Sequence, residues 1–385
     1  MEKDSPVFFL IAGEVSGDRH GADLIKELRK LYPEARFKGI GGDKLKAAGM
    51  ELLYHNSRLA FLGITEVVKH LPFIRRVMKD VKEELRKGVD AVILIDYPGF
   101  NLKIAPYAKK LGIPVIYYIC PQLWAWGEKR VEKIRRYVDL PLVIFKFEEL
   151  FYAQHGIEAE FVGHPLTEQI HITVGKEAFF RKHQLPIEKP LVGLFPGSRE
   201  MEIRKILPVM LQAVEMYQKK QDITIAIGAA SHIPTSLYQE FLSGNSDVPL
   251  ISGDEVHALM KYSHVGLVSS GTATLEMGYL QTPMVVLYSV SPITYWIGKR
   301  LVKIDTIALA NIVIGEKVVP ELIQGAMTAE KVLFELERYF QNPTYYNSVK
   351  ERLSDIQKEL GPPGAASRAA ARIASFLNQH PPQEI

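Results

Sequence analysis

The stretch Leu191-Val-Gly-Leu-Phe195-Pro-Gly-Ser-Arg-Glu200 leads an apolar run into a Pro-Gly-Ser turn and then into a helical pattern. The first five residues predict a buried β-strand, because parallel strands covered on both faces are continuous apolar runs. The turn predicts the start of a helix, where free backbone N–H groups and the positive end of the helix dipole favour an anion. A strand, a glycine-containing turn and a helix in this order form the building unit of doubly wound α/β sheets.

The same alternation of apolar runs and amphipathic segments fills most of the chain. Apolar runs predict strands at Val7–Ala12, Ala91–Asp96, Pro114–Cys120, Leu140–Ile144, Leu191–Phe195, Ile223–Ile227, Val265–Ser269 and Met284–Tyr288. Amphipathic segments predict helices at Asp23–Leu31, Thr65–Arg86, Leu102–Leu111, Ile203–Tyr217 and Thr272–Leu280. Strands separated by helices predict βαβ units and parallel sheets.

A break at Gly163-His-Pro-Leu166 divides this pattern into two halves. We therefore expect an α/β protein with two Rossmann-like, doubly wound domains that face a cleft. The expected domains are 1–168 and 169–340, followed by helices over 341–385 that are free to pack back on the N-terminal domain. Ligands of open α/β sheets bind outside the carboxyl ends of the strands, so the residues after each strand are the candidates for chemistry.

The composition is that of an ordinary globular protein. The chain has 385 residues, 47 Lys and Arg against 44 Asp and Glu, and 47% hydrophobic residues. These values exclude a disordered chain, and the small net charge argues against a dedicated nucleic-acid binder. One cysteine, Cys120, excludes a disulfide framework and any cysteine-based metal site. Because no apolar run reaches the length of a membrane span, we expect a cytoplasmic protein.

Asp96 is the candidate catalytic residue. It ends an apolar strand and so stands at the carboxyl edge of the predicted sheet. Apolar neighbours raise the pKa of a carboxyl group, which suits it to act as a general base near neutral pH. The alternative interpretation is an aspartate that caps the turn or pairs with an arginine.

The loop Gly13-Glu-Val-Ser-Gly-Asp-Arg-His-Gly21 follows the first predicted strand. Its glycine spacing does not fit the dinucleotide-binding pattern, and no Gly-Lys-Ser/Thr follows as in a P-loop. The functional interpretation is a loop that lines the cleft and holds a polar ligand. The alternative is a tight strand–helix turn in which Ser16 or Asp18 caps the helix.

Two loops in the second half have the character of phosphate or ribose sites. Gly197 and Ser198 open one helix, and Arg199 adds a guanidinium group that can clamp a phosphate. Gly271 and Thr272 open a second helix, and Glu276 lies one turn further on. Such a site needs no metal, and the chain contains no Asp-x-Asp pair. The alternative for both loops is a plain helix cap with solvated side chains.

Three segments combine aromatic and basic residues, which is typical of a surface that meets an anionic amphiphile or a membrane. They are Pro121-Gln-Leu-Trp-Ala-Trp126 with the cations that follow it, Pro292–Lys303, and Leu59–Ile64 with Lys69, Phe73, Arg75 and Arg76. The third is the candidate for dipping into a membrane. The alternative is aromatic packing beneath a solvated basic face.

Taken together, these motifs resemble those of the lipid-A-disaccharide synthase family. The segments that carry the resemblance are Ala12-Gly-Glu-Val-Ser-Gly-Asp18, Gly39-Ile-Gly-Gly42, Ile95-Asp-Tyr-Pro-Gly-Phe-Asn101, Pro121-Gln-Leu-Trp-Ala-Trp126, Gly163-His-Pro-Leu166, Phe195-Pro-Gly-Ser-Arg-Glu200, Ser270-Gly-Thr-Ala-Thr-Leu-Glu276 and Leu309-Ala-Asn311. They span nearly the whole chain. The Trp-Ala-Trp and Gly-Glu-x-Ser-Gly-Asp segments are the most particular to this family.

The resemblance implies a GT-B type glycosyltransferase of Gram-negative bacteria that needs no cofactor and no metal. It would transfer 2,3-diacylglucosamine from UDP to the 6-hydroxyl of 2,3-diacylglucosamine 1-phosphate (lipid X), with inversion. Asp96 would be the base. The donor would contact Gly197, Ser198, Arg199, Gly271, Thr272, Glu276 and Asn311, and the acceptor side would contain Ser16, Gly17 and Asp18. Peripheral contact with the inner membrane and a homodimer are further expectations.

Two other functions remain open from the sequence. A UDP-N-acetylglucosamine 2-epimerase would share the Ser-Gly-Thr loop and the two domains, although the basic and aromatic segments speak against a water-soluble substrate. A non-enzymatic scaffold that binds nucleotide or lipid would not need a carboxylate in its cleft.

Overall fold

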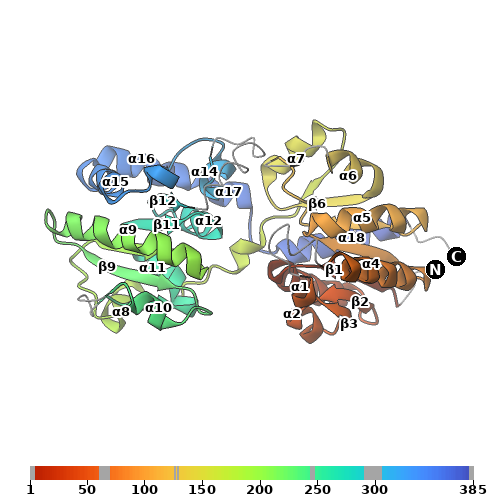
Figure 1. The fold of residues 1–385 in the computed structure, drawn as a ribbon. Helices are drawn as coiled ribbons and strands as arrows, with labels where there is room; N and C mark the ends of the chain where they lie inside the picture. The colour runs from red at the N-terminus through yellow and green to blue at the C-terminus, as the bar shows by residue number, and fades with distance from the viewer. Residues whose placement is uncertain are drawn as a thin grey trace. The chain divides into compact units, whose positions relative to one another are not determined.

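The computed structural model describes residues 5–59, 70–124, 127, 130–242, 248–289 and 306–380. The chain forms two compact units, Met1–Pro165 with Leu360–Ile385 and Leu166–Glu359 (Figure 1). Each unit has one parallel sheet flanked by helices. Among the described helices, none has the length and apolar character that crossing a membrane requires.

The sheet of unit 1 is parallel throughout. Its strands lie in the order β3 (Glu51–His55), β2 (Arg36–Gly41), β1 (Val7–Ala12), β4 (Ala91–Ile95), β5 (Val115–Tyr118), β6 (Leu140–Val143) and β7 (Glu160–Phe161). The direction of winding reverses between β1 and β4, which pair directly. This reversal is the topological switch point, where ligands of doubly wound sheets bind.

Alternate side chains of these strands pack on opposite faces of the sheet. One face forms an apolar core with α4 (Leu71–Arg86), α5 (Pro98–Lys110), α6 (Val131–Tyr137) and the end of α7 (Lys146–Ala153). Near the other face lie α1 (Val15–Leu31), α2 (Asp43–Ala47) and α18 (Ala365–Gln379). A Cβ atom at Gly21 would lie 2.9 Å from Ile95 Cδ1, so this glycine lets α1 approach the sheet closely.

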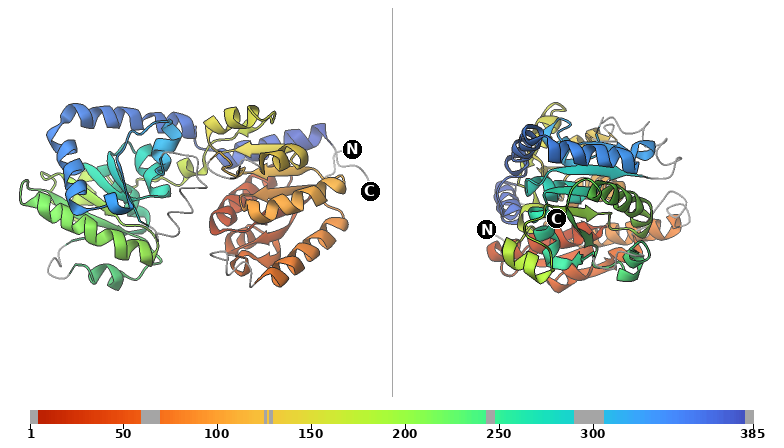
Figure 2. Two further views of the ribbon diagram at one scale, coloured as in Figure 1. Left: turned by 45° about the horizontal axis from the view of Figure 1, so that its top comes forward. Right: turned by 90° about the vertical axis from the view of Figure 1, so that its left-hand side faces the viewer.

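The C-terminal helix α18, at the blue end of the colour range, belongs to unit 1 (Figure 2). It packs against α1. The Arg368 guanidinium donates hydrogen bonds to the carbonyl oxygens of Val162, Pro362 and Pro363, at 2.6–2.8 Å. Arg372 forms an ion pair with Glu160 of the edge strand β7. Side chains of α18 therefore bind the last strand of the sheet to the chain terminus.

The sheet of unit 2 is also parallel throughout. Its order is β10 (Leu250–Ser252), β9 (Thr224–Ala229), β8 (Leu191–Phe195), β11 (Val265–Ser269), β12 (Met284–Tyr288) and β13 (Glu321–Ile323). The switch point lies between β8 and β11. The helices in the described part of this unit are α8 (Lys176–Lys182), α9 (Glu200–Gln218), α10 (Thr235–Gln239), α11 (Val256–Tyr262), α12 (Thr272–Tyr279), α14 (Leu309–Ile314), α15 (Ala329–Gln341), α16 (Pro343–Leu353) and α17 (Asp355–Leu360).

The α/β class and the two doubly wound sheets predicted from the sequence are confirmed. The eight predicted strands are all present, with ends that differ by no more than two residues. The helix after β4 begins at Pro98 rather than at Leu102, since proline is well suited to the first helical position. The predicted strands did not include β2, which pairs with β1, or the short edge strands β3, β7, β10 and β13, which lack a buried apolar run.

Candidate functional site

The predicted site residues other than Asn311 lie in or next to the loops at the two topological switch points. In unit 1, the loop that begins at Gly13 follows β1, and Asp96 follows β4; Ala12 and Ile95 are partners in the sheet. In unit 2, the loop at Gly197 follows β8, and the loop at Gly271 follows β11. The sheet order therefore brings predicted residues together in pairs of neighbouring loops, one pair in each unit.

Asp96 stands in a strained turn. Both Asp96 and Tyr97 have left-handed backbone conformations, with φ of 45° and 48°. For residues other than glycine this conformation costs about 1–2 kcal/mol each. The strain is offset by two hydrogen bonds to the Asp96 carbonyl oxygen, from Asn101 Nδ2 at 2.7 Å and from the Tyr117 hydroxyl at 2.6 Å. Such strained turns concentrate at functional sites, where the surrounding structure fixes a side chain in one direction.

The loops after β1 and β4 interlock through Tyr97 and Gly13. A Cβ atom at Gly13 would lie 2.3 Å from Tyr97 Cδ1, so the ring occupies the space that any other residue would need. The Tyr97 hydroxyl donates a hydrogen bond to the Leu59 carbonyl oxygen at 3.1 Å. The position of Asp96 thus depends on a glycine in the neighbouring loop.

Two carboxyl groups with raised pKa share this edge of the sheet. Burial raises the pKa of Asp96 above the ordinary aspartate value. Burial and, to a smaller extent, the charge of Asp96 raise the pKa of Glu14. Glu14 was not among the predicted site residues, although it directly follows Gly13 in the most characteristic motif. Its place at the end of a central strand was the signal that could have identified it.

The three predicted acceptor-side residues have different environments. Ser16 is exposed in the first turn of α1, and Gly17 is buried against Ala12. The Asp18 carboxylate accepts hydrogen bonds from the backbone N–H groups of Gly42, Lys44 and Leu45, at 2.6–3.1 Å. The expectation that Asp18 or Ser16 caps its own helix is wrong, because α1 begins one residue after Glu14 without a side-chain cap. Asp18 instead caps α2.

Two histidines lie near this edge of unit 1. Burial lowers the pKa of His20 to about 4 and that of His164 to about 3. Both rings are therefore uncharged near neutral pH, so neither adds a positive charge beside the two carboxyl groups.

The first loop of unit 2 contains an internal carboxylate. Glu202 accepts a hydrogen bond from Ser198 N at 3.2 Å, and its other oxygen lies 3.3 Å from Arg199 Nη1. Gly197 has a φ of +116°, and a Cβ atom there would lie 2.5 Å from the Glu202 carboxylate. The Arg199 side chain is 75% exposed, so most of its guanidinium faces solvent. Glu202 was missed, although a glutamate at the third helical position is a capping signal.

The second loop of unit 2 opens α12. Gly271 has a φ of +154°, and no atom lies within 4 Å of a Cβ placed there, so the space above this helix start is open. Thr272 is exposed. The Glu276 carboxylate lies 3.6 Å from the Nε2 atom of His257 on α11. His257 was not predicted, because nothing in the sequence connects these two helices.

Asn311 is buried and has no free hydrogen-bonding capacity. Its Nδ2 group donates to the Val319 carbonyl oxygen and to Glu321, each at 2.9 Å. Its Oδ1 atom accepts from the N–H groups of Val318 and Val319, each at 2.9 Å. Any effect of Asn311 on a ligand therefore acts through the segments that it holds in place.

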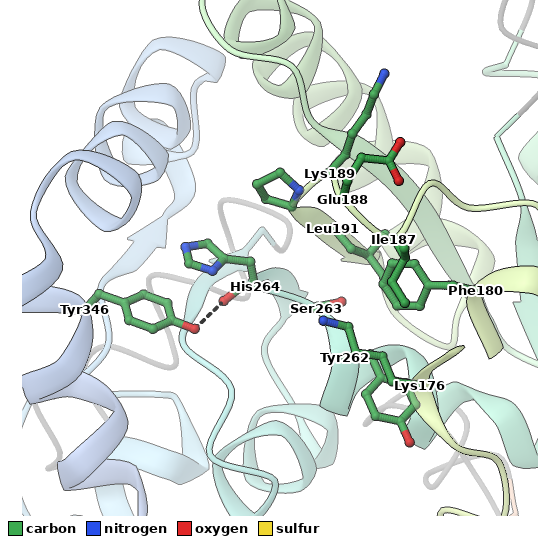
Figure 3. Close-up of a pocket in the computed structure, with 11 residues that line it drawn as sticks. Lys176, Phe180, Ile187, Glu188, Lys189, Leu191, Tyr262, Ser263, His264 and Tyr346 are labelled. Carbon is green, nitrogen blue, oxygen red and sulfur yellow. Dashed lines mark hydrogen bonds between the residues drawn. The ribbon is translucent and has the colours of Figure 1, made fainter. Parts of the chain in front are cut away.

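A pocket of about 340 Å³ lies at the amino ends of the central strands of unit 2, at the other end from the predicted donor loops (Figure 3). Its lining includes Pro190 and His264, the residues that precede β8 and β11. The Tyr346 hydroxyl donates a hydrogen bond to the His264 carbonyl oxygen across one side of it, at 3.3 Å. Because the predicted donor loops follow the other ends of these strands, this pocket is not the predicted donor site.

Some predicted features lie outside the described residues. These are Trp126, the greater part of the segment Leu59–Ile64, Lys69, and all of Pro292–Lys303. Within the described part of the chain, no three His, Cys, Asp or Glu side chains are grouped so that they could hold a metal ion.

Comparison with known proteins gives consistent results at the sequence level. The profile of the family described as "Lipid-A-disaccharide synthetase" matches residues 8–372. Lipid-A-disaccharide synthase from Geobacter sulfurreducens is 38% identical over 380 residues, which is 98% of this chain and 99% of the relative. The protein of the same name from Coxiella burnetii (strain CbuK_Q154) is 38% identical over 370 residues, 96% of this chain and 98% of the relative.

Solved structures share the fold at low sequence identity. UDP-GlcNAc 2-epimerase from Neisseria meningitidis, bound to UDP-GlcNAc, aligns with a TM-score of 0.59 and 14% identity over 98% of this chain and 100% of the other. A glycosyltransferase from Rickettsia africae aligns with a TM-score of 0.56 and 10% identity over 99% of this chain and 100% of the other. At such identities the likeness shows the fold alone.

Proposed function

Because this chain belongs to the lipid-A-disaccharide synthase family, it is a UDP-sugar-dependent glycosyltransferase, and we propose how its residues divide the work. The reaction transfers 2,3-diacylglucosamine from UDP to the 6-hydroxyl of 2,3-diacylglucosamine 1-phosphate, giving a β-1,6 disaccharide and UDP. The epimerase alternative is not favoured, since the relatives with 38% identity over nearly the full chain are synthases.

Asp96 is the general base of the transfer. The donor is α-linked and the product β-linked, so one displacement at the anomeric carbon accounts for the inversion. The acceptor oxygen forms the new bond to this carbon, the bond to the diphosphate breaks, and UDP leaves with the electron pair. Asp96 takes the proton of the 6-hydroxyl. The strained turn, fixed by Asn101 and Tyr117, is the observation that carries this assignment, because it holds in place the backbone that bears the carboxylate at the end of β4.

Unit 2 binds the donor. The diphosphate lies at the start of α9, beside Gly197 and the exposed Arg199 guanidinium, which provides positive charge. There it takes the place of Glu202 as the acceptor of the Ser198 N–H. Gly271 and Thr272 contribute the open start of α12, and Glu276 accepts hydrogen bonds from the ribose. Asn311 supports this site by holding the segment near Val318 to α14.

Unit 1 binds the acceptor. Ser16 is exposed beside Gly17, at the same edge of the sheet as Asp96. Asp18 contributes indirectly, because its carboxylate fixes the loop at Gly42 to α1. Glu14 lies close enough to Asp96 for their charges to interact, so its ionisation affects the base. The acceptor sugar is thus presented to Asp96 by the loop after β1.

The protein works at the cytoplasmic surface of the inner membrane, where both acylated substrates reside. In the described part of unit 1, Phe73, Arg75 and Arg76 belong to α4, whose exposed face is basic. Cations beside aromatic residues favour an anionic lipid surface. The homodimer implied by the resemblance stays a prediction.

The test is a product assay with purified protein, UDP-2,3-diacylglucosamine and lipid X. We expect the β-1,6 disaccharide and UDP from wild type, and a loss of at least about 100-fold for Asp96→Asn, the scale of a lost general base. Asp90→Asn is the matched control: Asp90 precedes the same strand and accepts a hydrogen bond from Val7 N at 2.7 Å, which asparagine can also accept. Full activity of Asp96→Asn would refute its role as base.

A further inference from the structure

Glu148 is a fully buried carboxyl group that the proposed reaction does not use. It lies in the first turn of α7, directly after β6. Its Oε2 atom accepts hydrogen bonds from the backbone N–H groups of Ile144 and Phe145, at 3.3 and 3.1 Å. Its Oε1 atom accepts one from the indole nitrogen of Trp124, at 2.9 Å. One carboxylate therefore joins the loop after β6 to the loop after β5.

The Trp124 loop is held by α7 at two further points. The buried Tyr152 hydroxyl donates a hydrogen bond to the Pro121 carbonyl oxygen at 2.8 Å. The ring of Phe147 meets the Trp124 ring edge to face, with 5.2 Å between the ring centres. Burying the Glu148 charge costs free energy that its three N–H partners must offset, whereas an exposed residue could cap α7 without that cost. A capping role alone therefore does not explain a carboxylate here.

The loop after β5 is the neighbour of the loop that contains Asp96. Strands β4 and β5 pair directly, and the Tyr117 hydroxyl of β5 donates to the Asp96 carbonyl oxygen at 2.6 Å. Trp124 is partly exposed, so its ring has a surface that is free to meet a ligand. A large flat apolar ring on the loop next to that of the base is suited to the apolar face of a sugar or to an acyl chain.

We propose that Glu148 is a positioning residue of the acceptor site: it fixes the Trp124 ring as a wall beside Asp96, through the indole hydrogen bond. Trp124 touches the acceptor lipid, and Glu148 acts through Trp124. The inference rests on the proposed function, which assigns the acceptor to unit 1.

The ionisation of Glu148 offers a readout that a purely structural role would not move. Burial raises the pKa of Glu148 to about 7, and its three N–H donors oppose this shift. When the carboxyl group takes up a proton, one oxygen becomes a donor and no longer suits all three N–H groups. The hold on Trp124 therefore weakens as the pH falls below about 7.

The titratable groups around Glu148 do not obscure this readout. Burial raises the pKa of Cys120 and of Tyr152 far above neutrality. His164 packs on Phe145, and burial lowers its pKa to about 3. On α7 itself, Lys146 and Glu149 flank Glu148.

The experiment is a double-mutant cycle with Trp124→Phe and Glu148→Gln, read as the KM for lipid X, kcat and the affinity for UDP. Phenylalanine keeps an aromatic ring but removes the indole N–H. Each single variant should raise the acceptor KM about tenfold, the factor expected for one hydrogen bond to a charged group, with unchanged UDP affinity. In the Trp124→Phe background, Glu148→Gln should raise the acceptor KM by a further factor of less than about two.

Glu149→Gln is the matched control, because Glu149 lies on the same helix and accepts a hydrogen bond from Phe161 N at 2.8 Å without touching Trp124. It should leave the acceptor KM unchanged. The ratio of the Trp124→Phe and wild-type KM values should also shrink as the pH falls from 8 to 6, and in this ratio the ionisation of the substrate cancels. Additive effects in the cycle, or a ratio independent of pH, would overturn the proposal.

Failure of this inference differs from failure of the proposed function. If Asp96→Asn kept full activity, the assignment of the base and the acceptor to the carboxyl end of the unit 1 sheet would be wrong, regardless of the acceptor KM of Trp124→Phe. If Asp96→Asn were inactive while Trp124→Phe had a wild-type acceptor KM, the base would stand and the positioning role of Glu148 would fall.

Discussion

Asp96 and Glu14 decide how activity depends on pH. A general base must be deprotonated, and burial raises the pKa of Asp96. We therefore predict that kcat/KM falls as the pH decreases through this raised pKa, with an acid limb above the range of an ordinary aspartate. Glu14→Gln removes the carboxyl group whose pKa the Asp96 charge raises. The variant should therefore keep the part of the acid limb that burial of Asp96 sets and lose any part that comes from Glu14. A wild-type profile that stays flat down to the ordinary aspartate range would contradict this prediction.

Arg199 supplies the strongest charge of the donor loop. Because its guanidinium is exposed and meets only Glu202 among the contacts that the structure describes, Arg199→Ala should leave the fold intact. We expect UDP affinity to fall by about 1.5–3 kcal/mol, the range for hydrogen bonds to a charged group. Calorimetric titration with UDP measures this loss. Arg204→Ala is the control, since Arg204 lies one turn along α9 and pairs with Glu200 and Glu240. Equal losses in both variants would argue against a specific clamp.

At the scale of single elements, the interlocked loops after β1 and β4 make Gly13 essential. An alanine Cβ would overlap the Tyr97 ring, 2.3 Å from Cδ1, and would push Tyr97 and Asp96 out of place. We predict a large loss of activity for Gly13→Ala. In Gly99→Ala, nothing lies within 4 Å of the new Cβ, and alanine favours the helix, so activity should persist. Steady-state kinetics of both variants, with circular dichroism to confirm folding, distinguish the two cases.

The sequence predicted the central strands because each is a continuous apolar run buried on both faces. It also placed the site at the strand ends, since the order of strands and helices fixes where the carboxyl edges lie. The strained turn could not be predicted, because its conformation depends on a hydroxyl group of Tyr117 from the next strand. The contact between Trp124 and Glu148 could not be predicted for the same reason, because it joins two loops that come together only when the sheet forms.

The candidate donor residues show a second reason why the site could not be fully predicted from the sequence. Asn311 carries the chemistry of a ligand contact in the sequence, but the structure uses all four of its hydrogen bonds internally. Burial is a property of the folded chain, so residue type alone could not distinguish a contact from a support. The same holds for Asp18, whose carboxylate is engaged by three backbone N–H groups.

At the scale of the whole molecule, unit 1 combines the first part of the chain with the C-terminal helix α18. Arg368 donates to three backbone carbonyl oxygens, two of them in the segment that enters α18. Lysine keeps the charge but lacks the planar fork of donors. We predict that Arg368→Lys lowers the thermal unfolding temperature of unit 1 and leaves UDP affinity, which depends on unit 2, unchanged. Unfolding followed by scanning calorimetry, with a UDP titration, tests this. A weaker UDP affinity at unchanged thermal stability would contradict it.

The role of Asp96 as the base is tested most directly by a single-turnover measurement of transfer by Asp96→Asn, with enzyme in excess over a limiting amount of donor and with saturating acceptor. Calorimetry with UDP first verifies that the variant still binds nucleotide. We predict that the rate of disaccharide formation falls by about 10² to 10⁴, the contribution of a general base, while UDP binding is unchanged. A rate within about threefold of wild type would show that another group takes the proton, and would remove Asp96 from the chemistry.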